Sequence, residues 1–288
     1  MHPICDWSLL FYFSIEMVLF PNAKINLGLN ILSKREDGYH ELETIFYPIG
    51  LKDGLEFVEN KLDKIVFTSS GLPLNINPEQ NIVAKAYSLL CADHPLPGLD
   101  IHLHKVIPFG AGLGGGSSDA AFLLKGLNDY FELGLFVSQL KKYAIRLGAD
   151  CSFFLENKPA FACGIGEQLQ NINFTLKGYF IVLVKPSVCV GTKEAYSGIT
   201  PAFSKLSLLD SIQLSPVNWG SCIVNDFETS VFKLYPEIGK IKTKLIEQGA
   251  FYASMSGSGS SVFGLFKSEP QISAIDFPAD YFIWKDWI

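Results

Sequence analysis

The sequence predicts an ordered globular protein of about two domains in which strands and helices are mixed. Its 288 residues are about twice the length of an average domain. Hydrophobic residues make up 48% of the chain and charged residues 18%, a balance that excludes a disordered protein. Strand-like alternation dominates residues 17–70, whereas helical spacing and strand-like runs follow one another after residue 81.

A glycine-rich segment, residues 108–118, lies between a predicted strand and a predicted helix. Residues 101–106 alternate in the manner of a half-buried strand, and apolar residues recur at helical spacing over residues 120–127. Five glycines among residues 110–116 let the backbone approach an anion, and the free N–H groups of a first helical turn point toward it. The segment is therefore predicted to bind phosphate groups. Its members are Pro108, Phe109, Gly110, Ala111, Gly112, Leu113, Gly114, Gly115, Gly116, Ser117 and Ser118, and the two serines are also candidates to cap the helix.

Two familiar phosphate-binding motifs match this segment only in part. The spacing Gly110-x-Gly112-x-x-Gly115 occurs in dinucleotide-binding folds, where a strand ending in an acidic residue follows within about twenty positions. Here a second helix-like stretch, residues 138–147, follows instead, which argues against that fold. The Walker A motif has a lysine where this chain has Gly116, so a bound triphosphate needs a cation from elsewhere in the chain.

Lys24 is the candidate for that cation. It lies in the predicted strand 23–31, where small or polar residues alternate with aliphatic ones, so Lys24 and Asn26 share one face. A lysine in so apolar a strand either extends its ammonium group to solvent or serves a binding site. The strand pattern leaves both roles open.

Asp150 follows the predicted helix 139–147, which Gly148 ends. An aspartate in this place either caps the next helix or takes part in chemistry. The remaining elements are predicted from the same patterns. Strands are expected at residues 18–20, 42–48, 55–68, 160–163, 179–185 and 262–266, and helices at residues 81–92, 224–235 and 236–248.

The overall charge and the cysteines limit the partners and the compartment. The formal net charge is −6 and no basic run compensates it, which argues against a nucleic-acid partner. The six cysteines show neither C-x-x-C nor paired spacing. They are therefore predicted to be free thiols in a reducing cytoplasm, with no disulfide framework and no zinc site.

Residues 1–16 differ in composition from the rest of the chain. No Lys or Arg precedes the apolar run 7–15, and that run is too short to span a bilayer. A regular strand pattern begins at Met17. We therefore interpret residues 1–16 as an extraneous leader, and we expect no membrane association.

Three stretches together resemble the GHMP kinase superfamily. They are residues 21–27, which contain Lys24 and Asn26, residues 108–118, and the Ser-Gly-Ser-Gly run at 256–259. The Arg-x-Asp-Gly-Tyr-His run at 35–40, the triple glycine before Ser117 and the Leu-Gly-Ala-Asp run at 147–150 are similar to one branch of that superfamily. That branch phosphorylates a cytidine diphosphate-linked methylerythritol. Cys151 and Ser152 depart from the Val-Pro often found there.

The resemblance implies an α+β, two-domain GHMP kinase fold. The N-terminal domain, residues 17–165, would be like ribosomal protein S5 domain 2 and would bind ATP. The C-terminal domain, residues 166–288, would be ferredoxin-like, and the active site would lie between the two. The implied protein is a cytoplasmic enzyme with a small-molecule substrate, either a monomer or a weak homodimer.

The resemblance also implies a role for each candidate site residue. Lys24 and Asp150 would be catalytic, the glycine-rich segment would hold the ATP phosphates, and Ser117 or Ser118 would help to hold Mg²⁺. The cytidine end of the substrate would face four residues, Asn26, Tyr39, His40 and Tyr196. Tyr196 is also compatible with an ordinary half-buried tyrosine.

The implied reaction is ATP-dependent phosphorylation of the 2-hydroxyl of the cytidyl substrate, in the non-mevalonate route to isoprenoid precursors. Two alternatives remain open at this point. One is another GHMP kinase of the homoserine or mevalonate type, which the Asp-Gly-Tyr-His run disfavours. The other is a nucleotide-binding sensor without turnover, which the presence of both Lys24 and Asp150 disfavours, because a sensor needs no base.

Overall fold

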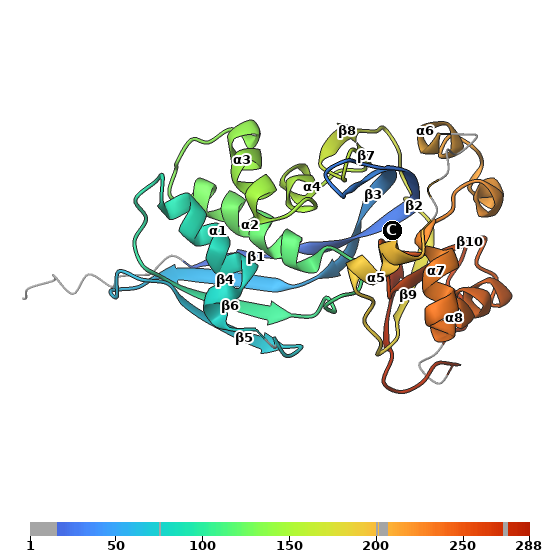
Figure 1. The fold of residues 1–288 in the computed structure, drawn as a ribbon. Coiled ribbons are helices and arrows are strands. Elements are labelled where there is room, and N and C mark those ends of the chain that lie inside the picture. The colour runs from blue at the N-terminus through green and yellow to red at the C-terminus, as the bar shows by residue number, and fades with distance from the viewer. Residues whose placement is uncertain (1–15, 75, 200, 202–206, 273–275) are drawn as a thin grey trace, which may run out of the picture.

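The computed structural model of the chain describes residues 16–74, 76–199, 201, 207–272 and 276–288. The predicted leader lies outside the described residues except for Glu16. Within the described ranges, no helix is long and apolar enough to cross a membrane. Strands and helices alternate along the chain, as predicted, and form two halves that share a central pair of long strands (Figure 1).

The first half is built on a four-stranded sheet in the order β1-β4-β6-β5. Its strands are β1 (Met17–Leu19), β4 (Gly54–Glu59), β6 (Leu99–Lys105) and β5 (Val66–Gly71). The single strand predicted at residues 55–68 is wrong, because β4 and β5 pair with opposite edges of β6. The turn between them is held by the Asn60 side chain, which accepts from the Leu62 N–H and donates to the Lys64 carbonyl.

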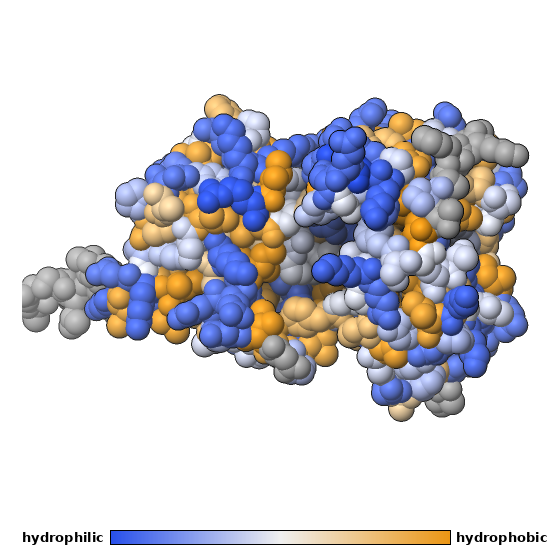
Figure 2. Space-filling view, in the orientation of Figure 1, coloured by the Kyte–Doolittle hydropathy of each residue, from blue (hydrophilic) through white to orange (hydrophobic). Residues whose placement is uncertain are grey.

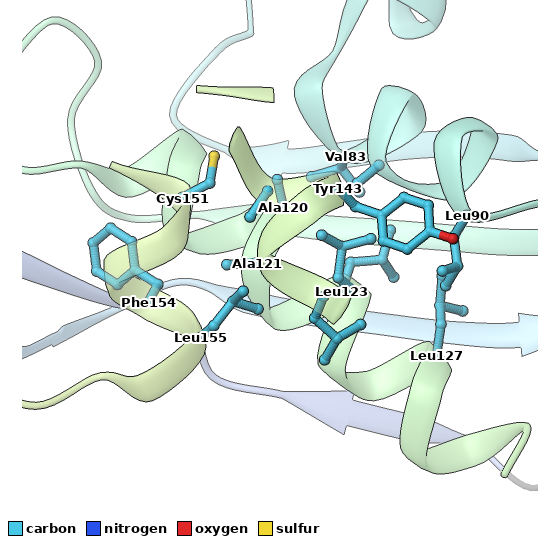
Figure 3. Packing of buried hydrophobic residues seen from close by; sticks show 14 of the residues in the cluster. Val83, Leu90, Ala120, Ala121, Leu123, Leu127, Tyr143, Cys151, Phe154 and Leu155 are labelled. Carbon is cyan, nitrogen blue, oxygen red and sulfur yellow. The ribbon is translucent and has the colours of Figure 1, made fainter. Parts of the chain in front are cut away.

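Four helices cover this sheet on one side (Figure 1). They are α1 (Ile82–Cys91), α2 (Gly115–Tyr130), α3 (Val137–Leu147) and α4 (Cys151–Glu156), and the 3₁₀ turn η1 (Pro78–Gln80) precedes them. Figure 3 shows how α2 supplies the centre of the packing, with Leu123 and Leu127 between the neighbouring helices. Close packing of this kind fixes the position of the N-terminal end of α2, where the glycine-rich segment leads into the helix.

The start of α2 differs from the prediction. The helix begins at Gly115, with Gly114 in a left-handed conformation at the N-cap and no side-chain cap hydrogen bond. Ser117 and Ser118 lie inside the first turn, so neither serine is the N-cap. Within the described part of the chain, the first-turn N–H groups therefore have no side-chain cap at the N-cap position.

A second sheet has the order β2-β3-β7-β8 and connects the two halves. Its strands are β2 (Asn22–Lys34), β3 (His40–Lys52), β7 (Ala160–Cys163) and β8 (Gln168–Asn171). Residues 22–31 of β2 are buried. Ala23, Ile25 and Leu27 pack in one cluster with residues of both the glycine-rich segment and the second half. The sheet continues into β8, past residue 165, so the division of the chain at residues 165/166 stays a prediction.

The second half contains a sheet in the order β10-β11-β9-β12. Its strands are β10 (Tyr252–Met255), β11 (Val262–Phe266), β9 (Phe180–Lys185) and β12 (Phe282–Trp287). The helices of this half are α5 (Thr192–Ser197), α6 (Leu208–Ser211), α7 (Phe227–Leu234) and α8 (Pro236–Glu247), with the 3₁₀ helix η2 (Pro216–Ser221). The prediction located β9, β11, α7 and α8 to within three residues, and it missed β10 and β12.

Candidate active site

A cavity of about 480 Å³ lies where the two halves meet. Figure 2 shows the hollow near the middle of the visible face. The glycine-rich segment forms one wall, β2 and β3 form the floor, and the second half closes the other side. The lining residues are Lys24, Asn26, Leu29, Leu42, Thr44, Phe46, Ile82, Lys105, Pro108, Phe109, Gly110, Ala111, Gly112, Leu113, Gly114, Gly115, Gly116, Ser117, Asp150, Ile165, Gly166, Val190, Thr192, Tyr196, Phe227, Gly257, Ser258 and Gly259.

Glycine is required at two positions of the glycine-rich segment. Gly112 has φ +71°, and a Cβ on it would lie 1.9 Å from the carbonyl oxygen of Ser256. Gly114 has φ +70°, and a Cβ there would lie 2.9 Å from the Phe154 ring. A side chain at either position therefore clashes, and the left-handed backbone is itself costly for other residues. The segment is held against both halves of the molecule.

The predicted phosphate-binding residues line this cavity as far as Ser117. The first turn of α2 opens toward it, and its N–H groups lack a side-chain cap, which is the arrangement of an anion site. Ser118 lies one residue further along, is fully buried and does not line the cavity. Its hydroxyl has no hydrogen-bond partner among the described residues.

Lys24 lies on the cavity floor and is buried, so its ammonium group does not extend to solvent. The Nζ atom donates to Asn26 Oδ1 at 2.6 Å and to the Gly112 carbonyl at 3.1 Å, and it lies 3.5 Å from Asp150 Oδ2. Burial lowers the pKa of Lys24, whereas the Asp150 carboxylate partly opposes that shift. The structure thus brings the strand lysine and the glycine-rich segment together.

Asp150 occupies the residue before α4, but its side chain makes no cap hydrogen bond. Instead, the carboxylate faces Lys24, and 32% of its side chain is exposed in the cavity. The side-chain geometry therefore does not fit the capping role. A half-open carboxylate beside an ammonium group can accept a proton from a bound hydroxyl.

The predicted substrate residues are only partly brought together. The Tyr196 ring lines the cavity and stacks on His40, with centroids 4.6 Å apart and planes 20° apart. Asn26 also lines the cavity, although its amide is engaged by Lys24 and by Thr44 Oγ1. Tyr39 is 61% exposed and is not among the lining residues.

A buried charge cluster below the glycine-rich segment was not predicted from the sequence. Lys105 Nζ lies 2.5 Å from Asp53 Oδ2 and 2.6 Å from Asp119 Oδ2. The other oxygen of Asp53 accepts from the N–H groups of Val106 and Ile107. Burial raises the pKa of Asp119 well above its ordinary value, and the Lys105 charge acts in the opposite direction. The cluster thus joins Val106 and Ile107, which lead into the glycine-rich segment, to the N-terminal part of α2.

Comparison with known proteins identifies the family of the chain. The family model for the GHMP kinases N terminal domain matches residues 81–158, and that for the GHMP kinases C terminal matches residues 203–276. The fold also resembles the mevalonate kinase of Methanococcus jannaschii, at a TM-score of 0.71 and 16% identity over 95% of this chain and 98% of that one. The chain belongs to the GHMP kinase family.

More similar relatives are named 4-diphosphocytidyl-2-C-methyl-D-erythritol kinase. The protein of Bacteroides fragilis is 54% identical over 92% of this chain and 97% of its own length. That of Parabacteroides distasonis is 51% identical over 93% and 98%. A crystal structure of 4-(cytidine 5'-diphospho)-2C-methyl-D-erythritol kinase superposes at a TM-score of 0.74 and 34% identity, over 86% of this chain and 90% of that one. The predicted fold class, the ATP-dependent kinase activity and the small-molecule substrate are confirmed.

Proposed function

We propose that this kinase transfers the γ-phosphoryl group of ATP to the 2-hydroxyl of 4-diphosphocytidyl-2-C-methyl-D-erythritol, in the non-mevalonate route to isoprenoid precursors. The observation that carries the proposal is the pair formed by Lys24 and Asp150 at the mouth of the glycine-rich segment. The names of the relatives support the choice of acceptor. We further propose that the enzyme is cytoplasmic and a monomer or weak homodimer.

The catalytic pair divides the chemistry between two charges. Asp150 accepts the proton of the acceptor hydroxyl as that oxygen attacks the γ-phosphorus. Lys24 lies close enough to stabilise the developing alkoxide and the negative charge on the transferring phosphoryl group. Because Asn26 Oδ1 and the Gly112 carbonyl hold the ammonium group, it is positioned before the substrate arrives.

The glycine-rich segment holds the phosphates of ATP through backbone N–H groups at the start of α2. The donor set fits the Mg²⁺ that accompanies ATP, because in kinases this ion binds mainly to phosphate oxygens and to one or two protein oxygens. Ser117 is the better placed of the two predicted serine ligands, since it lines the cavity and Ser118 does not. When bound, the ion neutralises phosphate charge.

The cytidine end of the acceptor is assigned to the side of the cavity where Tyr196 lies. Its ring lines the cavity and offers a stacking surface for a pyrimidine. Asn26, which lines the cavity, and His40, which stacks on Tyr196 but does not itself line the cavity, offer polar groups for the base edge. Tyr39 would have to turn toward the cavity to join them, because it is exposed in this structure. The stacked Tyr196 and His40 rings therefore support this assignment of the cytidyl subsite.

A coupled assay tests the proposal directly. ADP release is measured with 4-diphosphocytidyl-2-C-methyl-D-erythritol, homoserine and mevalonate as separate acceptors, at the same enzyme and ATP concentrations. We expect turnover with the cytidyl acceptor alone. A preference for homoserine or mevalonate would reassign the acceptor, and ATP binding without turnover on any of the three would indicate a nucleotide-binding sensor.

A further inference from the structure

Asn225 is a buried polar residue at the junction of the two halves. It is 2% exposed and lies two residues before α7. Its segment runs beside β2, because the Leu29 N–H donates to the Val224 carbonyl at 2.9 Å and the Asp226 N–H donates to the Leu29 carbonyl at 2.8 Å. These two bonds attach the segment to the strand that also carries Lys24.

The amide of Asn225 uses both of its donors on one loop. Nδ2 donates to the carbonyls of Met255 and Gly257, both at 2.8 Å. The side-chain oxygen Oδ1 accepts from the Phe227 N–H at 3.0 Å. This bond gives a partner to one of the N–H groups at the start of α7. An asparagine is the residue type that supplies two N–H donors and an acceptor from so short a side chain.

The loop that Asn225 holds, residues 256–259, is part of the active site. Gly257, Ser258 and Gly259 line the cavity. Ser256 Oγ donates to the Gly112 carbonyl at 2.8 Å, and the same carbonyl accepts from Lys24 Nζ. The position of this loop therefore affects both the glycine-rich segment and the catalytic lysine.

The contact between loop 256–259 and the glycine-rich segment tolerates little movement. The backbones meet directly, because a Cβ on Gly112 would lie 1.9 Å from the Ser256 carbonyl oxygen. Directly after the loop, the Ser260 N–H donates to the Gly110 carbonyl and the Ser261 N–H donates to the Ala111 carbonyl. A shift of the loop would thus move the residues that face the ATP phosphates.

We propose that Asn225 is a positioning residue, which holds loop 256–259 against the glycine-rich segment and so maintains the ATP site. This inference deepens the proposed function but rests only on its ATP site, and not on the identity of the acceptor. Asn225 does not line the cavity, so it acts through Met255 and Gly257 and touches no substrate.

The test compares the same substitution at two buried asparagines. Asn225→Ser keeps a hydroxyl that can cap α7 but removes the donors to the Met255 and Gly257 carbonyls. Asn30→Ser is the matched control, because Asn30 is 3% exposed and its Nδ2 donates to Glu43 Oε1, away from the loop. Calorimetry gives the Kd of a non-hydrolysable ATP analogue, and Tm is measured for each variant.

We expect Asn225→Ser to bind the analogue about tenfold more weakly than the unchanged chain, a difference of about 1.4 kcal/mol. Asn30→Ser should bind it normally even where its Tm falls by the same amount. Steady-state rates should show a raised KM for ATP in Asn225→Ser, with the KM for the cytidyl acceptor changed much less.

Several outcomes would overturn the proposal. Unchanged analogue binding in folded Asn225→Ser would do so, as would equal weakening in both variants, which indicates general destabilisation. If Asn225→Ser does not fold, Asn225→Asp replaces it, since this variant keeps the side-chain shape and the acceptor for Phe227. Failure of both to fold while Asn30→Ser folds would show that Asn225 serves folding. A wild-type chain that binds the analogue but phosphorylates no cytidyl acceptor would refute the proposed function only.

Discussion

At the scale of single residues, Asp150 has a position and an orientation that point to different roles. It stands where a cap belongs, but its carboxylate faces Lys24 and not the N–H groups of α4. We expect Asp150→Asn to lower kcat by about 10²- to 10⁴-fold because the amide accepts no proton. Tm should change little, because Asp150 makes no cap hydrogen bond that the substitution could remove and Asn has the same size and shape. Initial rates and thermal unfolding measure the two effects, and near-normal turnover would refute the assignment.

Lys24 can be tested by removing its charge while keeping its length. Lys24→Met retains the aliphatic stem on the cavity floor but loses the ammonium group. We expect kcat/KM to fall by about 10²-fold or more, the scale on which one group that stabilises transition-state charge contributes. A lysine that only packs against its strand would tolerate the change. The double variant with Asp150→Asn should lose much less than the product of the two single losses, because both groups act in one transition state.

The pH profile provides a separate test of Lys24. Burial lowers the pKa of this lysine below its ordinary value, which is about 10.4. Since the proposed role requires the charged form, activity should be present below the lowered pKa and lost as the pH rises through it. We therefore expect the alkaline limb of kcat to lie below the range of an exposed lysine. An alkaline limb at the ordinary lysine value would contradict the role.

Tyr196 is the residue through which the acceptor subsite can be tested. Its ring stacks on His40 and packs edge-on against Phe227, at 4.8 Å between centroids. Tyr196→Ala should weaken the cytidyl acceptor by about 1–3 kcal/mol, the scale of base–aromatic stacking, while KM for ATP stays constant. Tyr196→Phe is the control, because it keeps the ring. Equal losses for both substrates in Tyr196→Ala would indicate general damage to the cavity.

At the scale of elements, the cluster of Lys105, Asp53 and Asp119 joins the end of β6 to α2 and to the turn between β3 and β4. Lys105→Met leaves two buried carboxylates without their cation. We expect the free energy of unfolding to fall by about 3–5 kcal/mol in urea titrations at neutral pH. The loss should shrink at lower pH, because the raised pKa of Asp119 lets that carboxyl become neutral as the pH falls.

Lys141→Met is the control for this cluster. It removes a partly exposed pair with Glu156, which should contribute no more than about 1 kcal/mol. An equal loss of stability in the two variants would contradict the special role of the buried cluster.

At the scale of the whole molecule, the described contacts of the first sheet begin at β1. Met17 pairs with Phe57, and Leu19 packs against Gly126 of α2. We expect a chain that starts at Met17 to fold with the same Tm and to show the same turnover as the full chain. Thermal unfolding and the coupled assay compare the two. Loss of soluble protein or of turnover on removal of residues 1–16 would disprove the leader interpretation.

The sequence predicted those features that depend on neighbours along the chain. The glycine-rich segment, the helix that follows it and the strand that carries Lys24 depend on local spacing, and the structure contains all three. The motifs of the GHMP kinases are short and contiguous, so they could be recognised without coordinates. The start of α2 was misjudged because Ser117 and Ser118 are typical caps, whereas the left-handed Gly114 actually ends the loop.

The tertiary structure decided which distant residues meet. The local pattern around Asp150 fits both a helix cap and a catalytic carboxylate, and only the tertiary structure shows that the carboxylate lies beside Lys24. The sequence did not indicate a role for Lys105, because both of its acidic partners come from other elements. It did not indicate one for Asn225 either, because the amide of Asn225 holds a loop 32 positions further along the chain. Periodicity and capping report the environment of a residue within a turn or a strand. The pairing of charges and amides depends on how the sheets and helices pack, and this is set by the whole buried surface.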